Sequence, residues 1–395
     1  MQLPSMFHIY KAASNGSGFE HWRSTDDFVS YIISERWQGG SDIEIVYSEN
    51  EFNYLDMLFN QEFGNVNNFY FVYVSEVETM FVITSYDFTE TYTDGISIIL
   101  KGVDILTWLS TGHVYTLKEK EYKYNNRDFL QKMAEGISTI NSVPILVKGT
   151  IDSNGAFGWG SEHPLYTSET ISSTVDGGSS FNDIVTNYLG QMCVGFTSRV
   201  AITNGSSISR LEYYYTLPQD RTKKLMTIKD GQLSSIRFYR TFDNLVNHVT
   251  EYGVGFDDKA RYVTDTIESS NNKFTKRMHF VNSSVSVSTI KQLYGEDNPN
   301  IQNATWVNEK IDMVMHADGK KFLEEPVTLM ECVYNHNYVE WDDNEPAVGD
   351  VFSVGVGTHG VSSHMIVQEK IISKSGSEES VVLTLQDTKE IFPWL

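Results

Sequence analysis

Apolar and polar residues alternate with a period of two along much of the chain. Alternation of this kind is typical of half-buried strands in antiparallel sheets. The segment Phe69–Val74 (FYFVYV) is instead apolar at every position, which predicts a central strand or a strand at an interface. The alternating stretches are 42–48, 80–88, 96–101, 365–371 and 381–386.

Helical spacing of apolar residues is rarer. The sequence predicts a short helix over 102–109, directly after a strand, and further helices over 125–140, 180–193 and 300–316. Because these helices interrupt a β-rich chain and do not alternate regularly with strands, the pattern disfavours a doubly wound α/β fold. We therefore predict a mainly β fold with α+β insertions, made of two small β-barrel domains and a mixed α/β middle domain.

The chain divides into three zones by pattern. Residues 1–118 are predicted as a first β-barrel domain and 119–220 as a mixed α+β middle domain. Residues 221–395 are predicted as a second β-barrel domain with a polar and helical insertion around 269–325. The two β zones share an outline of strand, turn, long strand, polar turn and strand, which hints at duplication although residue identity is low. The matching segments are 69–75, 80–88 and 96–102 in the first zone, and 350–356, 363–372 and 380–387 in the second.

The composition favours a packed protein with a strongly negative field. The 395 residues include 52 Asp and Glu against 30 Lys and Arg, a formal net charge of -22. Because 40% of the residues are hydrophobic and 13% are aromatic, the chain can form a packed core, and global disorder is excluded. The negative field disfavours phosphate binding through a global basic surface, and a local basic patch stays open.

The sequence predicts neither export through a cleavable signal nor membrane insertion. Residues 1–18 lack a basic stretch followed by an apolar run. The longest apolar-leaning stretch, 96–109, carries Lys101 and Asp104 and is too short and too polar to span a bilayer. We therefore expect a soluble protein with no signal peptide and no membrane-spanning segment.

The two cysteines offer little chemistry. Cys193 and Cys332 cannot build a disulfide framework for a chain of this size, and we expect two buried free thiols. Cys332 with His336 could be proposed as a nucleophile pair, but no recognised nucleophile context surrounds it and no third group is placed to orient the base.

A metal or carboxylate site is also disfavoured. His359 and His364 lie five residues apart, downstream of several acidic residues, but no HExxH or similar zinc motif is present. The segment 152–155 resembles the start of a calcium loop, yet no glutamate stands at the twelfth position. Adjacent acidic pairs are expected on solvated faces in a chain this acidic. We assign no catalytic residue, no cofactor and no metal ligand, and predict a protein that is not an enzyme. The acidic residues upstream of the histidine pair are Asp342, Asp343 and Glu345.

Three stretches, in order along the chain, carry a resemblance to a known family. The first, 31–109, contains ERWQGG and ends in LKGVDILTWL, and it resembles the N-terminal domain of siphophage tail-associated proteins. The second, 214–222 (YYTLPQDRT), is similar to that family's G-x-D-R-T segment, with Pro and Gln in place of the usual small residues. The third, 238–247 (FYRTFDNLVN), is close to its F-S-x-x-F-x-N-L segment, and Val348–Val351 with two strands matches its closing barrel.

The resemblance to this siphophage tail-associated, or baseplate hub, family implies a tail-tip hub with the contractile-phage hub fold. Such a hub is a homotrimer in which each chain supplies two small barrels, so that six barrels match a hexameric tail tube. The first barrel would be the tube-docking domain. The resemblance places the protein at the tail tip of the virion, made in the host cytoplasm. Tail-tube or distal tail proteins would lie above it, and a central fibre, spike or lysin below.

Further expectations follow from the hub resemblance. Phage DNA would pass through the ring during genome ejection without specific binding, which suits a negative lumen. The sequence ends at Leu395, soon after the closing barrel, so we expect the hub alone, with any lytic activity carried elsewhere. The candidate subunit-interface strand consists of Phe69, Tyr70, Phe71, Val72, Tyr73 and Val74.

Two other functions stay open. A cell-wall-degrading tail-associated hydrolase would need a concave pocket in which two carboxylates or metal ligands converge. A host-surface glycan-binding adhesin would need an exposed aromatic platform, and the chain has 22 Tyr and 7 Trp. Most of these aromatic residues lie at alternating strand positions and are expected in the core.

Overall fold

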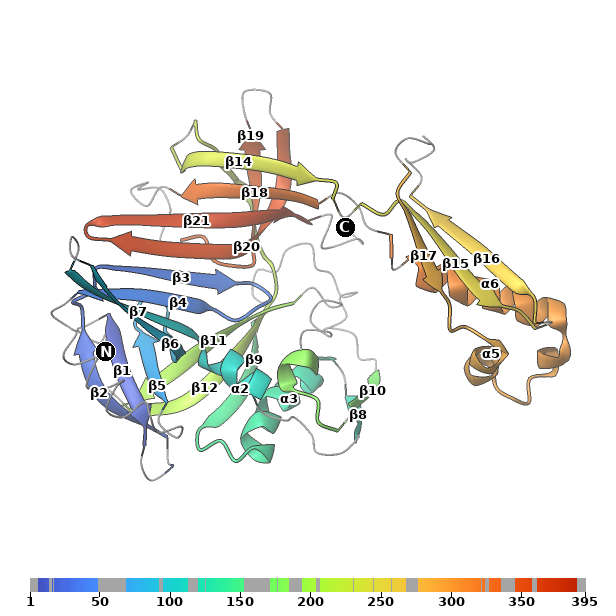
Figure 1. Ribbon diagram of the computed structural model, residues 1–395, viewed down its shortest axis with the longest axis horizontal. Helices are drawn as coiled ribbons and strands as arrows, with labels where there is room; N and C mark the ends of the chain where they lie inside the picture. Colours follow the sequence, from blue (N-terminus) through green and yellow to red (C-terminus); the bar gives the residue numbers. More distant parts are fainter. Residues whose placement is uncertain are drawn as a thin grey trace. The chain divides into compact units, whose positions relative to one another are not determined.

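The computed structural model contains two compact units (Figure 1). The first unit combines Met1–Arg237 with Leu329–Leu395, and the second is Phe238–Thr328. The predicted boundaries at 118 and 220 both lie within the first unit, and the predicted insertion at 269–325 lies entirely within the second. The structure describes residues 6–13, 16, 18–48, 69–91, 95–112, 120–124, 126–152, 171–175, 177–184, 194–203, 207–229, 231–243, 245–256, 258–267, 276–320, 322–323, 327–334, 345–356 and 361–388.

A 13-stranded sheet dominates the first unit, and the fold is mainly β as predicted. The strands run in the order β14-β18-β21-β20-β3-β4-β7-β6-β5-β1-β2, with β19 also paired to β20 and β13 to β19. Their bounds are β1 (Phe7–Ala12), β2 (Phe19–Thr25), β3 (Ser30–Arg36), β4 (Asp42–Ser48), β5 (Tyr70–Val74), β6 (Thr79–Thr91), β7 (Gly95–Asp104), β13 (Gln219–Met226), β14 (Leu233–Thr241), β18 (Val327–Tyr334), β19 (Asp350–Val356), β20 (Val361–Ser375) and β21 (Glu378–Asp387).

The two predicted strand–turn–strand outlines both form, but they belong to one sheet. Among the strands that the structure describes, no closed barrel is seen. The physical reason is the length of β20. Its second part, Glu369–Ser375, extends past β19 and pairs in antiparallel with β3, which joins the C-terminal strands to the N-terminal ones.

Smaller elements cover one face of this sheet. Helix α2 (Ile105–Gly112) follows β7, and helix α3 (Asn126–Ile140) packs against a mixed three-stranded sheet of order β11-β12-β9. The predicted helix over 125–140 is confirmed, and its buried face includes Phe129, Leu130 and Met133. Of the predicted helix over 180–193, only its first part lies in the described range, and it is helical from Phe181. The remaining strands of this unit are β8 (Lys120–Tyr124), β9 (Leu146–Asp152), β10 (Ile171–Val175), β11 (Gly195–Thr203) and β12 (Ser207–Thr216).

Strand β5 explains the apolar run FYFVYV. It lies between β1 and β6, and all five of its side chains are buried. Val72 and Val74 belong to the core on one face of the sheet, whereas Phe71 and Tyr73 belong to the core formed with α2, α3 and the three-stranded sheet. A strand that separates two cores has no polar face, so the alternation disappears.

The second unit is a three-stranded sheet packed against a helix. The strand order is β16-β15-β17, and α6 (Ala304–Lys320) places Val307, Ile311 and Met315 in the core of this unit. The predicted helix over 300–316 is thus present, and it begins at Ala304 after a short 3-10 turn. The other bounds are β15 (His248–Val254), β16 (Ala260–Thr266), β17 (Met278–Asn282), α5 (Val287–Tyr294) and η2 (Pro299–Gln302).

Candidate functional site

The long hairpins β6–β7 and β20–β21 match pair for pair. The pair Phe81↔Asp104 in the first corresponds to Met365↔Asp387 in the second. Each hairpin has a β-bulge at the same place, after the third pair, and each second strand ends in an aspartate. Because bulges bend a strand at a defined position, coincident bulges mean that the two hairpins share their shape as well as their length. The bulges fall between Ile83 and Ser85 and between Val367 and Glu369.

The neighbours of the two hairpins correspond as well. The order β1-β5-β6-β7-β4-β3, which we call the N-terminal half-sheet, has a counterpart in β13-β19-β20-β21-β18-β14, the C-terminal half-sheet. One difference is that β1 is antiparallel to β5 whereas β13 is parallel to β19. The chain therefore contains the same arrangement of strands twice, which agrees with the duplication inferred from the sequence pattern.

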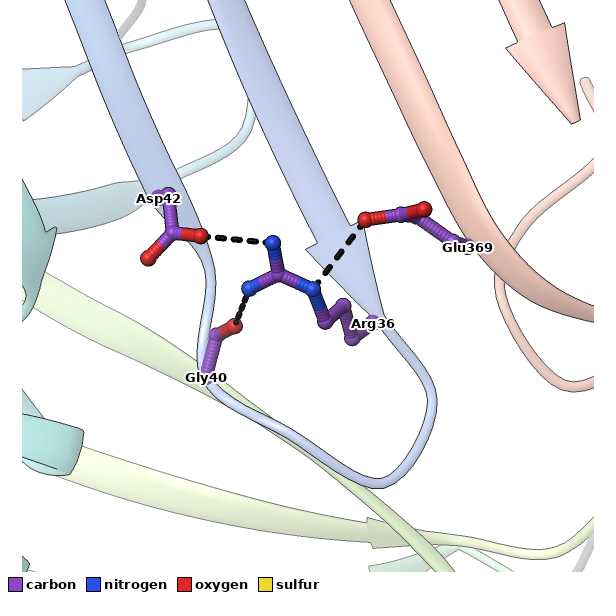
Figure 2. Close-up of polar contacts among 4 residues, drawn as sticks. All are labelled: Arg36, Gly40, Asp42 and Glu369. Carbon is purple, nitrogen blue, oxygen red and sulfur yellow. Dashed lines mark hydrogen bonds and ion pairs between the residues drawn. The ribbon is translucent and has the colours of Figure 1, made fainter. Parts of the chain in front are cut away.

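Arg36 lies where the two half-sheets meet (Figure 2). It ends β3, and its backbone pairs with Glu369 of β20. Its guanidinium contacts the Glu369 carboxylate at 3.1 Å, the Asp42 carboxylate at 2.6 Å and the Gly40 carbonyl oxygen at 3.1 Å. All three guanidinium nitrogens are thus used, and they connect β20, β3 and the turn that leads into β4.

Trp37 follows as the next residue of the ERWQGG motif and is fully buried. Its backbone N–H donates to the Gln368 carbonyl of β20, and its own carbonyl accepts from the Phe196 N–H of β11. A Cβ on Gly195 would lie 2.1 Å from the indole ring and one on Gly349 would lie 2.7 Å from it, so both positions need glycine. The motif therefore links the junction of the two half-sheets to β11 of the three-stranded sheet.

The second motif meets the closing segment of the chain. Gln219 of β13 pairs with Asp350 of β19, and the Arg221 guanidinium lies 3.1 Å from the Asp350 carboxylate, which is 1% exposed. Burial raises the pKa of Asp350 to about 6, and the nearby Arg221 and Lys370 oppose that rise. These residues are far apart in sequence, so their contact ties two of the motif segments together.

Asp104 is a buried carboxyl that sequence reasoning did not single out. Its Oδ1 accepts from the backbone N–H groups of Leu106 and Thr107 at 2.7 and 2.9 Å and so caps α2. Its second oxygen accepts from the Ser198 hydroxyl of β11. Burial raises the pKa of Asp104 to about 7. The available signal was an aspartate directly before a helix, within the GVDILTWL segment.

The candidate interface strand lies inside the chain for most of its length. Tyr70–Val74 is buried between neighbouring strands. Phe69 is 41% exposed, and the centroid of its ring lies 5.7 Å from the centroid of the Trp108 ring. The role of this strand at a subunit interface stays a prediction.

The residues considered for chemistry are dispersed. Cys332 is buried, and burial raises the pKa of its thiol to about 12. His364 is exposed, with Nδ1 3.2 Å from the Ser353 hydroxyl oxygen, and Glu345 lies 3.4 Å from the Lys370 ammonium. Within the ranges described above, no group of three or more His, Cys, Asp or Glu is placed to hold a metal ion, and no helix has the length and apolarity to cross a membrane. Cys193, His336, Asp342, Asp343 and His359 lie outside the described residues.

The second unit has a buried acidic cluster on the side facing α6. Asp265 lies 3.0 Å from the His316 ring Nδ1, and Glu251 is 2% exposed. Burial raises the pKa of Glu251. A Cβ on Gly319 would lie 2.9 Å from the Asp265 carboxylate, so the glycine allows α6 to approach the sheet at this point.

The opposite face of this small sheet exposes aromatic side chains. Tyr262 is 67% exposed, Phe280 is 69% exposed and Tyr252 is 38% exposed. Tyr252 and Tyr262 face each other across β15 and β16, with ring centroids 5.2 Å apart. Exposed aromatic rings grouped on one face are unusual for a surface that contacts only water.

Solved structures of phage tail proteins are similar to this chain over almost its whole length. A tail protein from Neisseria meningitidis MC58 matches with a TM-score of 0.53 and 10% identity, covering 98% of this chain and 98% of that chain. The 43 kDa tail protein of prophage MuSo2 from Shewanella oneidensis matches with a TM-score of 0.52 and 10% identity, covering 97% of this chain and 99% of that chain. At this identity the likeness concerns the fold.

No sequence-family model and no curated protein matches the chain. The likeness is therefore carried by the arrangement of strands and helices. The resemblance to phage tail proteins, which the three sequence motifs indicated, is confirmed at the level of the fold.

Proposed function

Because this chain has the fold of phage tail proteins, we propose that it is a structural, non-enzymatic hub of a tail tip. In this proposal three copies form a ring with pseudo-sixfold symmetry that caps the tail tube and contributes to the DNA exit channel. The observation that supports it best is the internal duplication. One chain carries two half-sheets of equal strand order, joined edge to edge through β3 and β20.

The symmetry argument is simple. A hexameric tube presents six equivalent positions, and three chains with two similar half-sheets each present six similar positions. When the same contact repeats around an axis, and the rotation from one copy to the next adds up to a full turn, the copies form a closed ring. In the proposed ring, distal tail or tail-tube proteins bind above, and a central fibre, spike or lysin binds below.

The charge of the chain suits a DNA exit channel. With a formal net charge of -22, the long-range field repels phosphates, so DNA would pass without being held. In this proposal the protein resides in the virion tail tip.

The proposal is tested by measuring the mass of the purified chain, alone and mixed with its tail-tube partner, by mass photometry. We expect a trimer, and images of the particle that show six lobes around a channel. A chain that stays monomeric even with its tail partners present would contradict the hub.

A second candidate function is glycan binding by the second unit, which the exposed Tyr252, Tyr262 and Phe280 favour. Aromatic rings on one face of a sheet can stack on sugar rings. Binding of the full chain to host wall polysaccharide is expected to fall in Tyr262→Ala and to persist in Trp108→Ala, a control on an exposed residue of the first unit. Equal binding by both variants and the parent chain would contradict this function.

A further inference from the structure

The small sheet of the second unit has an inverted distribution of charge. Successive side chains of a strand point to opposite faces of its sheet, and β15, β16 and β17 pair in continuous register. The Asp, Glu, Lys and Arg residues of these strands, which are Glu251, Arg261 and Asp265, lie on the face that α6 covers. There Arg261 contacts Asp312 and Asp265 contacts His316. The exposed face of these three strands therefore carries no charged residue, the reverse of a sheet with one side in water.

Three aromatic rings cross the exposed face on a diagonal. Tyr262, Tyr252 and Phe280 come from β16, β15 and β17, so each strand supplies one ring. Tyr252 pairs directly with Tyr262, whereas Phe280 pairs with Thr250, which lies two residues before Tyr252 on the same face of β15. The rings thus form a line across the sheet, and all three are exposed.

Uncharged hydrogen-bonding groups lie beside these rings. Asn282 pairs with Tyr252, and Thr264 pairs with Thr250, with 3.3 Å between the two threonine hydroxyl oxygens. Hydroxyl and amide groups both donate and accept hydrogen bonds. A ligand suited to this face offers flat apolar surface and many hydroxyl groups and has no charge. A neutral sugar ring has these properties.

The size of the face disfavours a protein partner. Strands β15 and β16 have seven residues each and β17 has five, so the face measures about 23 Å by about 14 Å, or about 300 Å². A stable interface between two proteins takes about 800 Å² from each partner. A second copy of the chain would need a much larger surface than these strands offer.

The charge of the chain disfavours an anionic ligand. The net charge of -22 repels anionic polymers at long range, and the exposed face of the three strands has no Lys or Arg to hold them. An uncharged ligand approaches without this repulsion.

We propose that the exposed face of β15, β16 and β17 binds a linear, uncharged polysaccharide that lies across the strands along the line Tyr262–Tyr252–Phe280. Each aromatic ring packs on the C–H face of one sugar, and Thr264 and Asn282 bond to sugar hydroxyl groups. This inference rests on the candidate function of glycan binding given above, and it adds the class of glycan and the direction in which it lies.

The test uses wall polysaccharide of the host, separated by anion exchange into a neutral and an anionic fraction. Each fraction is titrated into the full-length chain by isothermal titration calorimetry. We expect saturable binding of the neutral fraction alone. Tyr262→Ala and Phe280→Ala should each weaken it about tenfold. The matched control is Tyr239→Ala, at an exposed tyrosine of β14 outside the three strands, and it should bind as the parent chain does.

Two further measurements test the stacking and the linear ligand. Tyr262→Leu keeps an apolar side chain but loses the flat ring, so it should weaken binding as much as Tyr262→Ala, with the unfolding midpoint unchanged. Fragments of the neutral fraction that contain three or more sugars should compete with the intact polymer, whereas its monosaccharides should not. Parent-like binding by Tyr262→Leu, or full competition by monosaccharides, would overturn the proposed contact.

The outcomes separate this inference from the function on which it rests. Binding of the anionic fraction alone, or binding of the neutral fraction that neither ring variant weakens, would overturn the inference and leave glycan binding standing. Binding of neither fraction would overturn both. If, in addition, Tyr262→Ala reduced self-association in mass photometry, the face would be an interface between copies of the chain.

Discussion

The buried carboxyl of Asp104 should make the stability of the first unit depend on pH. Its folded-state pKa is raised to about 7 from 3.8, because burial penalises the charged form. Since the folded-state value is the higher one, the protonated carboxyl favours folding. This contribution is fully present below 3.8 and is lost as pH rises through about 7. Its full size is about 4 kcal/mol.

The perturbation that isolates this effect is Asp104→Asn. Asparagine keeps an oxygen that can accept from the Leu106 and Thr107 N–H groups, so the cap on α2 is retained, but it cannot ionise. The stability of the parent chain minus that of the variant should fall by about 2.5 kcal/mol between about pH 5 and about pH 8. The raised pKa of Asp350 is present in both chains and cancels in the difference.

Urea unfolding at several pH values supplies the measurement. Trp306 is the one tryptophan in 238–328, so a Trp306→Phe background restricts tryptophan fluorescence to the rest of the chain. If the difference in free energy of unfolding between the parent chain and Asp104→Asn stays constant with pH, the reasoning is refuted. A difference that grows as pH rises would show that the helix N–H groups lower the pKa of Asp104 more than burial raises it.

Three further results are expected. Arg36→Met should lower the free energy of unfolding by about 1–3 kcal/mol and speed amide hydrogen exchange in β3 and β20, because a charged hydrogen-bonding cluster is lost; unchanged exchange would contradict the role given to the half-sheet junction. Gly195→Ala should destabilise the fold severely through overlap with a buried indole, whereas Gly112→Ala, with no atom within 4 Å of the added Cβ, should be tolerated; equal unfolding midpoints would refute this. In a Cys193→Ser background the Cys332 thiol should react with a thiol reagent only after unfolding, because burial raises its pKa to about 12; fast reaction of the folded chain would show otherwise.

The alternating pattern predicted the strands well, because one face of most of them is buried. It placed β4, β6, β7, β20 and β21. It predicted the apolar Phe69–Val74 run as either a central or an interface strand, without showing that this run separates two cores. The predicted helix at 102 begins later, at Ile105, since β7 continues to Asp104 and that side chain caps the helix. Helix starts depend on such caps more than on apolar spacing.

The merging of two expected barrels into one sheet could not be read from the sequence. It depends on the pairing of β3 with the long strand β20, in which the paired residues Arg36 and Glu369 are 333 positions apart. Periodicity reports which face of a strand is buried, and it carries no information on which strand lies at its edge. For the same reason the ERWQGG motif marked Arg36 as notable, whereas its partners became visible only in the structure.

The position of Phe238–Thr328 in the chain has a consequence for how this fold can change. The segment leaves the sheet from β14 and returns to it in β18, and these two strands are hydrogen-bonded neighbours. It therefore occupies the place of an ordinary turn. The entropic cost of closing a connection rises slowly with its length, so a whole module can replace a few turn residues at little cost. A lineage could exchange that module while the sheet that carries it stays intact.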